Sequence, residues 1–99
     1  MLASARVLVV EDDVALAQTE VELLREGLPG VEIVAVNDGL RAWEVLSADG
    51  ADVVLSDVAL PGIDALELLK RIRGDHNLSS TAVILVTGVI SPEKLFSLL

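Results

Sequence analysis

Several residue types are scarce or missing in this chain of 99 residues, and each gap excludes a class of site. There is no cysteine, which excludes disulfides and thiolate metal ligands and indicates a reducing compartment such as the cytoplasm. Trp43 and Phe96 are the only aromatic residues, so there is no platform on which bases could stack. Seven basic residues against sixteen acidic ones leave a formal net charge of −9, and we therefore expect no direct contact with nucleic acid.

Long apolar runs are also missing. The longest, such as residues 82–86, are far shorter than the roughly 20 residues that a membrane-spanning helix needs. Residues 1–6 lack the apolar core with a basic flank that marks a secretory signal. We therefore expect neither a membrane span nor a signal peptide. Hydrophobic residues nevertheless make up 53% of the chain, which is enough to bury the core of one small domain over residues 1–99.

Four short apolar segments, at residues 7–10, 31–36, 53–55 and 82–86, alternate with helical patterns. The first segment is continuous rather than alternating, which is typical of a strand that is covered on both faces. The first helix is predicted from apolar residues in steps of three and four, and we expect it to end at Gly27. The residues of this predicted stripe are Val14, Ala17, Val21, Leu24 and Leu28.

Polar residues mark the starts of the later helices. Asn37 or Asp38 is expected to cap a helix that runs through Leu46, and Asp64 is expected to cap the next one. The Ser-Pro-Glu sequence at 91–93 is typical of the start of a fourth helix. Strands that alternate with helices predict an α/β fold, a doubly wound parallel sheet with helices on both faces. Ligands of such sheets bind at the carboxyl ends of the strands.

Acidic residues stand at two of these strand ends. Glu11 and Asp12 follow the first strand and Asp57 follows the third, and these strands are expected to be neighbours. Like charges about 4 Å apart repel by roughly 4 kcal/mol per pair at an effective dielectric near 20, so a proton or a cation must relieve the crowding. Oxygen ligands without histidine or cysteine select Mg²⁺. A carboxylate beside Mg²⁺ can attack a phosphoryl group, to which the Thr87 hydroxyl at the end of the last strand could donate.

Each of these residues also has a plain structural interpretation. Acidic residues after strands commonly cap helices, and Asp13 is most simply a cap. Glu11 and Asp12 alone would more often form a solvated loop than a metal site, and Thr87 alone is an ordinary strand end. Asp57 is harder to explain in this way, because no helix is expected to begin at it. The functional hypothesis depends on the coincidence of all of them at one sheet edge.

Four segments resemble, in order and in spacing, the receiver domain of bacterial two-component response regulators. They are VVEDD at 9–13, NDGLRA at 37–42, VLSDVALPGID at 54–64 and ILVTG at 84–88. The resemblance implies a flavodoxin-like sheet with strand order 2-1-3-4. It also implies a phospho-accepting module that takes a phosphoryl group from a sensor histidine kinase or phosphotransfer protein. Such a module is not an enzyme beyond its own phosphorylation and dephosphorylation.

The same resemblance assigns roles to individual residues. Asp57 is the implied phosphoacceptor, and Asp57 and Asp12 are implied Mg²⁺ ligands. Glu11 is implied to hold the ion through water, and the main-chain carbonyl of Ala59 is implied to be a further ligand. Thr87 is the implied switch hydroxyl, which moves towards the phosphoryl group.

The chain departs from the family near its C-terminal end. Receivers have five strands and five helices, with a lysine at the end of the fifth strand, whereas this chain stops at Leu99 inside the expected fourth helix. Lys94 is the nearest lysine, and we expect it to be a surface charge. Residues 82–86 are then predicted to form an edge strand that is apolar on both faces. We expect the chain to be an incomplete receiver. The alternatives are a homodimer, formed through that edge or by a swapped C-terminal segment, and a fragment that cannot be phosphorylated normally.

Two other functions stay open at this point. A degenerate receiver would act only as a protein-interaction module, which the missing lysine favours. A Mg²⁺-dependent phosphatase with an aspartyl nucleophile would carry a second acid two residues after that nucleophile, where this chain has Ala59.

We also expect His76 to be an exposed loop residue and Trp43 to contribute to packing.

Overall fold

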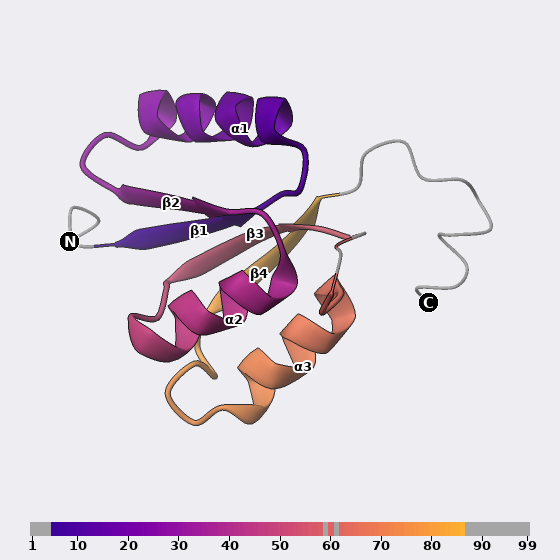
Figure 1. Ribbon diagram of the computed structural model, residues 1–99. Helices are drawn as coiled ribbons and strands as arrows, with labels where there is room; N and C mark the ends of the chain where they lie inside the picture. The colour runs from indigo at the N-terminus through magenta and orange to yellow at the C-terminus, as the bar shows by residue number, and fades with distance from the viewer. Residues whose placement is uncertain (1–4, 59, 61, 87–99) are drawn as a thin grey trace.

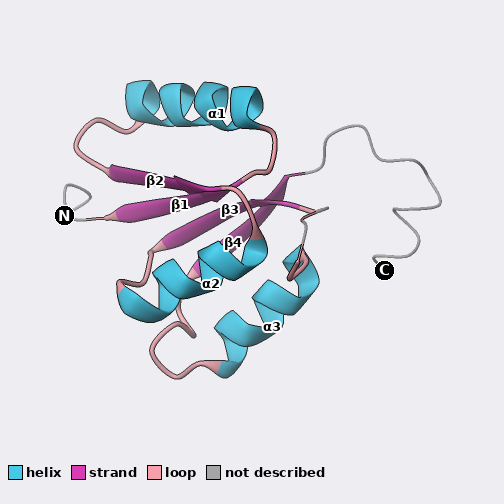
Figure 2. Cartoon of the chain, viewed as in Figure 1, coloured by secondary structure: helices cyan, strands magenta, loops and turns pink. Residues whose placement is uncertain are grey.

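The computed structural model describes residues 5–58, 60 and 62–86 of the chain. In this part, strands and helices alternate in the predicted order (Figures 1 and 2). The elements are β1 (Arg6–Val10), α1 (Val14–Gly27), β2 (Glu32–Val36), α2 (Gly39–Ala48), β3 (Val53–Asp57), α3 (Ala65–Gly74) and β4 (Ala82–Val86). The helix expected after residue 91 lies outside the described residues.

The four strands form one parallel sheet in the order β2-β1-β3-β4, which confirms the flavodoxin-like order. α1 covers one face of this sheet, and α2 and α3 lie on the other (Figure 1). β1 is paired on both sides, since Val9 lies opposite Ala35 of β2 and Leu55 of β3. β4 lies at an edge of the described sheet, as expected. Its residues Ile84 and Leu85, which point to opposite faces, are 52% and 38% exposed.

An aspartate caps the start of each described helix. The side chains of Asp13, Asp38 and Asp64 each accept a hydrogen bond from the backbone N–H three residues later, at 3.0, 2.7 and 2.8 Å. Asp38, rather than Asn37, is therefore the cap of α2. The first helix ends at Gly27 as predicted. None of these helices is both long and apolar enough to cross a bilayer.

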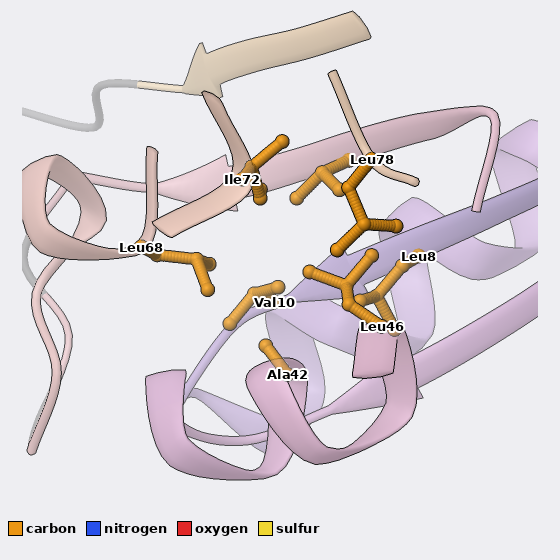
Figure 3. Packing of buried hydrophobic residues seen from close by; sticks show 8 residues of the cluster. Leu8, Val10, Ala42, Leu46, Leu68, Ile72 and Leu78 are labelled. Carbon is orange, nitrogen blue, oxygen red and sulfur yellow. The ribbon is translucent and has the colours of Figure 1, made fainter. Parts of the chain in front are cut away.

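The main hydrophobic core lies between the sheet and the layer formed by α2 and α3 (Figure 3). All the apolar residues of β1 are buried, so the continuous run at 7–10 is a strand covered on both faces, as predicted. Because side chains alternate along a strand, Leu8 and Val10 face α2 and α3, whereas Val7 and Val9 face α1. The core residues are Leu8, Val10, Ala42, Leu46, Val54, Leu68, Ile72 and Leu78.

The opposite face of the sheet is more thinly covered. α1 packs over β1 and β2 but contains no buried residue. Ala17, Val21 and Leu24 are half-buried, as the predicted stripe requires. Val14, which is 69% exposed, and Leu28, which is 37% exposed, do not belong to the covered face, so the prediction was wrong for both ends of the stripe. α1 is the only described helix on its side of the sheet, so no other described helix packs beside it there.

Gly39 sets how closely α2 approaches the loop before α3. A Cβ atom built on Gly39 would overlap the carbonyl oxygen of Ile63 and would lie 2.8 Å from its carbonyl carbon. These are backbone atoms, which cannot rotate aside as the end of a flexible side chain can. The start of α2 therefore contacts the β3–α3 loop only because residue 39 lacks a side chain.

We expect Gly39→Ala to lower the free energy of unfolding by about 1–3 kcal/mol, the usual cost of inserting atoms into a well-packed site. Urea denaturation followed by Trp43 fluorescence measures this change. Gly74→Ala is the matched control, because a Cβ built at this position near the end of α3 meets no described atom within 4 Å beyond its chain neighbours and its own helix backbone. The control should be at least as stable as the wild type. Equal stability of the two variants would contradict a required close contact at Gly39.

Candidate functional site

Carboxylates from two strands meet at the carboxyl edge of the sheet. Glu11 and Asp12 directly follow β1, and Asp57 is the last residue of β3. Val10 lies opposite Ser56 in the register of these strands, so the residues that follow reach the same edge. One oxygen from each of Glu11, Asp12 and Asp57 lies within 4.8 Å of the other two. The structure therefore brings together the three acidic residues singled out in the sequence.

The three acidic side chains differ in their access to solvent. Glu11 is only 4% exposed, whereas Asp12 is exposed and Asp57 is partly buried. The backbone N–H of Glu11 donates to the carbonyl oxygen of Val36 at 3.1 Å, and its Oε2 accepts a hydrogen bond from the backbone N–H of Asp13 at 3.0 Å. Glu11 is thus held within the protein, and Asp12 is the acid of the cluster most open to an approaching ion or ligand.

The pKa of the Glu11 carboxyl reflects its burial and the nearby acidic side chains. Burial raises the pKa of the Glu11 carboxyl above its ordinary value, and the hydrogen bond from the Asp13 backbone offsets part of that rise. A hydrogen bond with the Asp12 side chain and the negative charges of Asp57 and Glu20 raise the pKa further. Acidic groups that disfavour one another's charge in this way are stabilised by a bound cation or by a proton.

The main chain of Asp57 belongs to the sheet rather than to a loop. Asp57 lies opposite Val86 of β4, and the backbone N–H of Val58 donates to the carbonyl oxygen of Val86 at 3.3 Å. The hydroxyl of the buried Ser56 donates to the carbonyl oxygen of Asp57 at 2.9 Å. The carboxylate of Asp57 therefore projects from a fixed strand end.

Sequence reasoning missed one acidic residue near this site. Glu20, in the middle of α1, is half-buried, and burial together with the negative charge of Asp57 raises the pKa of its carboxyl. The sequence did contain a pattern that could have identified Glu20 as a partly buried residue. Glu20 stands three residues after Ala17 and four before Leu24, so it shares the face of the predicted apolar stripe.

The remaining predicted positions lie away from the cluster or outside the described residues. His76 is exposed in the turns that follow α3, as predicted. Trp43 is packed against the main core, also as predicted, and the guanidinium carbon of Arg71 lies 5.7 Å from the centroid of its ring. Outside the described residues are Ala59, Thr87 and Lys94.

The donor set of the cluster fits a hard divalent cation. Glu11, Asp12 and Asp57 offer only carboxylate oxygens, which are the ligands that Mg²⁺ prefers. Oxygens that lie within 4.8 Å of one another are close enough to share one ion. These three residues could therefore hold Mg²⁺, and a carboxylate so placed can also attack a phosphoryl group.

Comparison with known proteins gives this cluster a family context. A family model described as the response regulator receiver domain matches residues 7–98. The transcriptional regulatory protein CrdR of Helicobacter pylori is 36% identical over 84 residues, which are 85% of this chain and 38% of that protein. The sensory transduction protein RegX3 of Mycolicibacterium smegmatis is 41% identical over 82 residues, which are 83% of this chain and 34% of that protein. The chain thus spans little more than a third of the length of these curated relatives.

Solved structures share the fold as well as part of the sequence. The chemotaxis response regulator CheY4 of Vibrio cholerae superimposes with a TM-score of 0.79 and 30% identity, over 92% of this chain and 74% of that one. The signal receiver domain of a signal transduction histidine kinase from Syntrophus aciditrophicus gives a TM-score of 0.82 and 30% identity, over 96% of this chain and 71% of that one.

Receiver domains generally use Mg²⁺ at an acidic pocket, are generally phosphorylated by histidine kinases and are not enzymes in the usual sense. The acidic cluster at the ends of β1 and β3 is compatible with that use of metal. The family match over residues 7–98, the strand order and the position of the acidic cluster are consistent with one another. The chain therefore belongs to the receiver-domain family of two-component response regulators.

Proposed function

We propose that this chain is a phosphorylation switch in which Asp57 accepts a phosphoryl group from a phosphohistidine of a sensor histidine kinase or phosphotransfer protein. The observation that carries the proposal is the convergence of Glu11, Asp12 and Asp57 within 4.8 Å in a chain of the receiver family. The proposed Mg²⁺ ligands are Asp12, Asp57 and the main-chain carbonyl of Ala59, with Glu11 holding the ion through water.

The proposed transfer is a substitution at phosphorus. A carboxylate oxygen of Asp57 forms a bond to phosphorus while the bond between phosphorus and the donor imidazole nitrogen breaks. The electron pair of the broken bond stays on the imidazole, so Asp57 carries an acyl phosphate and the donor histidine is released. Mg²⁺, when bound, neutralises charge on the phosphoryl oxygens. Because Asp57 projects from a paired strand, little orientational freedom has to be lost before attack.

Phosphorylation changes the charge at the end of the sheet. The phosphoryl group adds about −1.5 to −2 units of charge and three acceptor oxygens. We propose that the hydroxyl of Thr87 donates to one of these oxygens and so transmits the change to the segment after β4. Support for this role comes from the chain order, because Thr87 directly follows Val86, the register partner of Asp57.

The proposal also covers the binding partners of this chain and the cellular compartment in which it acts. A net charge of −9 supports a domain that does not itself contact nucleic acid, and the lack of cysteine supports a cytoplasmic setting. A homodimer through the β4 edge or a swapped C-terminal segment stays a prediction, supported by the exposure of Ile84 and Leu85. The comparisons do not support the alternative of a receiver that acts only through protein contacts.

We expect Mg²⁺ to raise the thermal unfolding midpoint of the wild type, because a ligand that binds only the folded state stabilises it. The gain is about 2.7 kcal/mol at a ligand concentration one hundred times the dissociation constant. Asp12→Asn removes a proposed ligand and should lose most of the shift in a thermal scan with and without Mg²⁺. Glu44→Gln removes an exposed charge on α2 that forms an ion pair with Arg41, and it should keep the shift. A full shift in Asp12→Asn would argue against metal binding at this cluster.

We expect incubation with Mg²⁺ and acetyl phosphate to add one phosphoryl group to the chain, measured by intact-protein mass spectrometry. Asp57→Asn should abolish the gain, because the nucleophilic carboxylate is lost. Asp49→Asn, which changes an exposed acid at the end of α2, should be labelled like the wild type. Labelling of Asp57→Asn would reject Asp57 as the acceptor, and repeated turnover of phosphomonoesters would favour a phosphatase instead.

A further inference from the structure

Glu20 interrupts the sheet-facing side of α1. Ala17, Glu20, Val21 and Leu24 are the only half-buried residues of this helix, and their spacing places them on one face. Glu20 is the single charged member of that set. Burial disfavours a charged carboxylate, so an acid costs stability at a position where its neighbours are apolar.

The face of the sheet that lies under α1 is also the face of the acidic cluster. Side chains alternate along a strand, and Val10 belongs to the core under α2 and α3. Glu11, the next residue, therefore faces α1. Asp57 follows Ser56, the register partner of Val10, and so it faces α1 as well. Glu20 on the inner side of α1 and these two carboxylates thus share one side of the sheet.

We propose that Glu20 is a fourth carboxylate of the site, whose charge increases the affinity for a divalent cation and destabilises the domain when that cation is absent. The oxygens that converge within 4.8 Å come from Glu11, Asp12 and Asp57, so Glu20 acts through its charge rather than as a direct ligand. This inference rests on the proposed function, because it assumes that the other three acids bind the cation.

Glu20 interacts electrostatically with two acids of the cluster, Asp57 and Glu11. The negative charge of Asp57 is one cause that raises the pKa of Glu20, and the charge of Glu20 is one cause that raises the pKa of Glu11. The side chain of Glu20 forms no hydrogen bond with another described residue, and none of the ion pairs in that part of the chain involves it. Its charge is therefore available to a cation in the cluster, and partial burial limits screening by salt.

The test compares Glu20→Gln with Glu22→Gln in the full 99-residue chain. Glu22→Gln removes the same charge from an exposed position two residues further on, outside the half-buried face of α1. Mg²⁺ affinity is measured by calorimetric titration, and the unfolding midpoint is measured in a chelator. At low ionic strength we expect Glu20→Gln to bind Mg²⁺ roughly 3- to 10-fold more weakly than the wild type, as for the loss of one charge within about a Debye length. Without metal, the same variant should unfold at a higher temperature than the wild type.

Glu22→Gln should match the wild type in both measurements, and Glu20→Asp, which keeps the charge, should recover most of the affinity. The difference between Glu20→Gln and the wild type should shrink near 1 M salt, where the Debye length falls to about 3 Å. Equal Mg²⁺ affinity of Glu20→Gln, Glu22→Gln and the wild type would overturn the role of Glu20 and leave the proposed function intact. A wild type that binds no Mg²⁺ would overturn both.

Discussion

The pairing of β1 with β3 is the constraint on which the acidic site depends. Burial of apolar side chains stabilises these strands, and the apolar residues of β1 are removed from solvent on both faces. Because Val10 lies opposite Ser56, Glu11 and Asp57 cannot move apart without breaking the sheet. The repulsion between the carboxylates, roughly 4 kcal/mol for a pair about 4 Å apart at an effective dielectric near 20, is therefore offset by the core rather than relieved by movement.

Glu11, Asp12 and Asp57 differ in burial, and therefore each can contribute to the cluster in a different way. Glu11 is buried and held by a backbone hydrogen bond from Asp13, so its position is set before any ligand arrives. Asp12 is exposed, which leaves a route for a hydrated ion. Asp57 stands at a strand end whose main chain is paired with β4. This arrangement suits the proposed function, in which the site admits an ion and a phosphoryl donor while Asp57 keeps a fixed orientation.

The two faces of the sheet contribute in different ways. The α2 and α3 side contains the main core and gives the sheet its stability, whereas the α1 side is thinly covered and carries Glu11, Asp57 and Glu20. A half-buried helix can tolerate an acid such as Glu20, because part of its charge remains solvated. On the α2 and α3 side, Gly39 allows the start of α2 to contact the β3–α3 loop that follows Asp57.

The sequence by itself determined the order of strands and helices, the aspartate caps and the group of acids at the sheet edge. These features follow from the spacing of hydrophobic residues and from the hydrogen-bonding chemistry of residues that are close in the chain or that stand at strand ends. Both are local properties of the sequence. Only the tertiary structure decided that Asp38 caps α2, that Val14 and Leu28 lie outside the covered face of α1, and that Glu20 is electrostatically coupled to Asp57. Helical periodicity places residues on a face, but the way in which α1 crosses β1 and β2 sets how deeply each is buried and which charges it meets. That crossing follows from the packing of distant segments, which the spacing of residues within one helix does not specify.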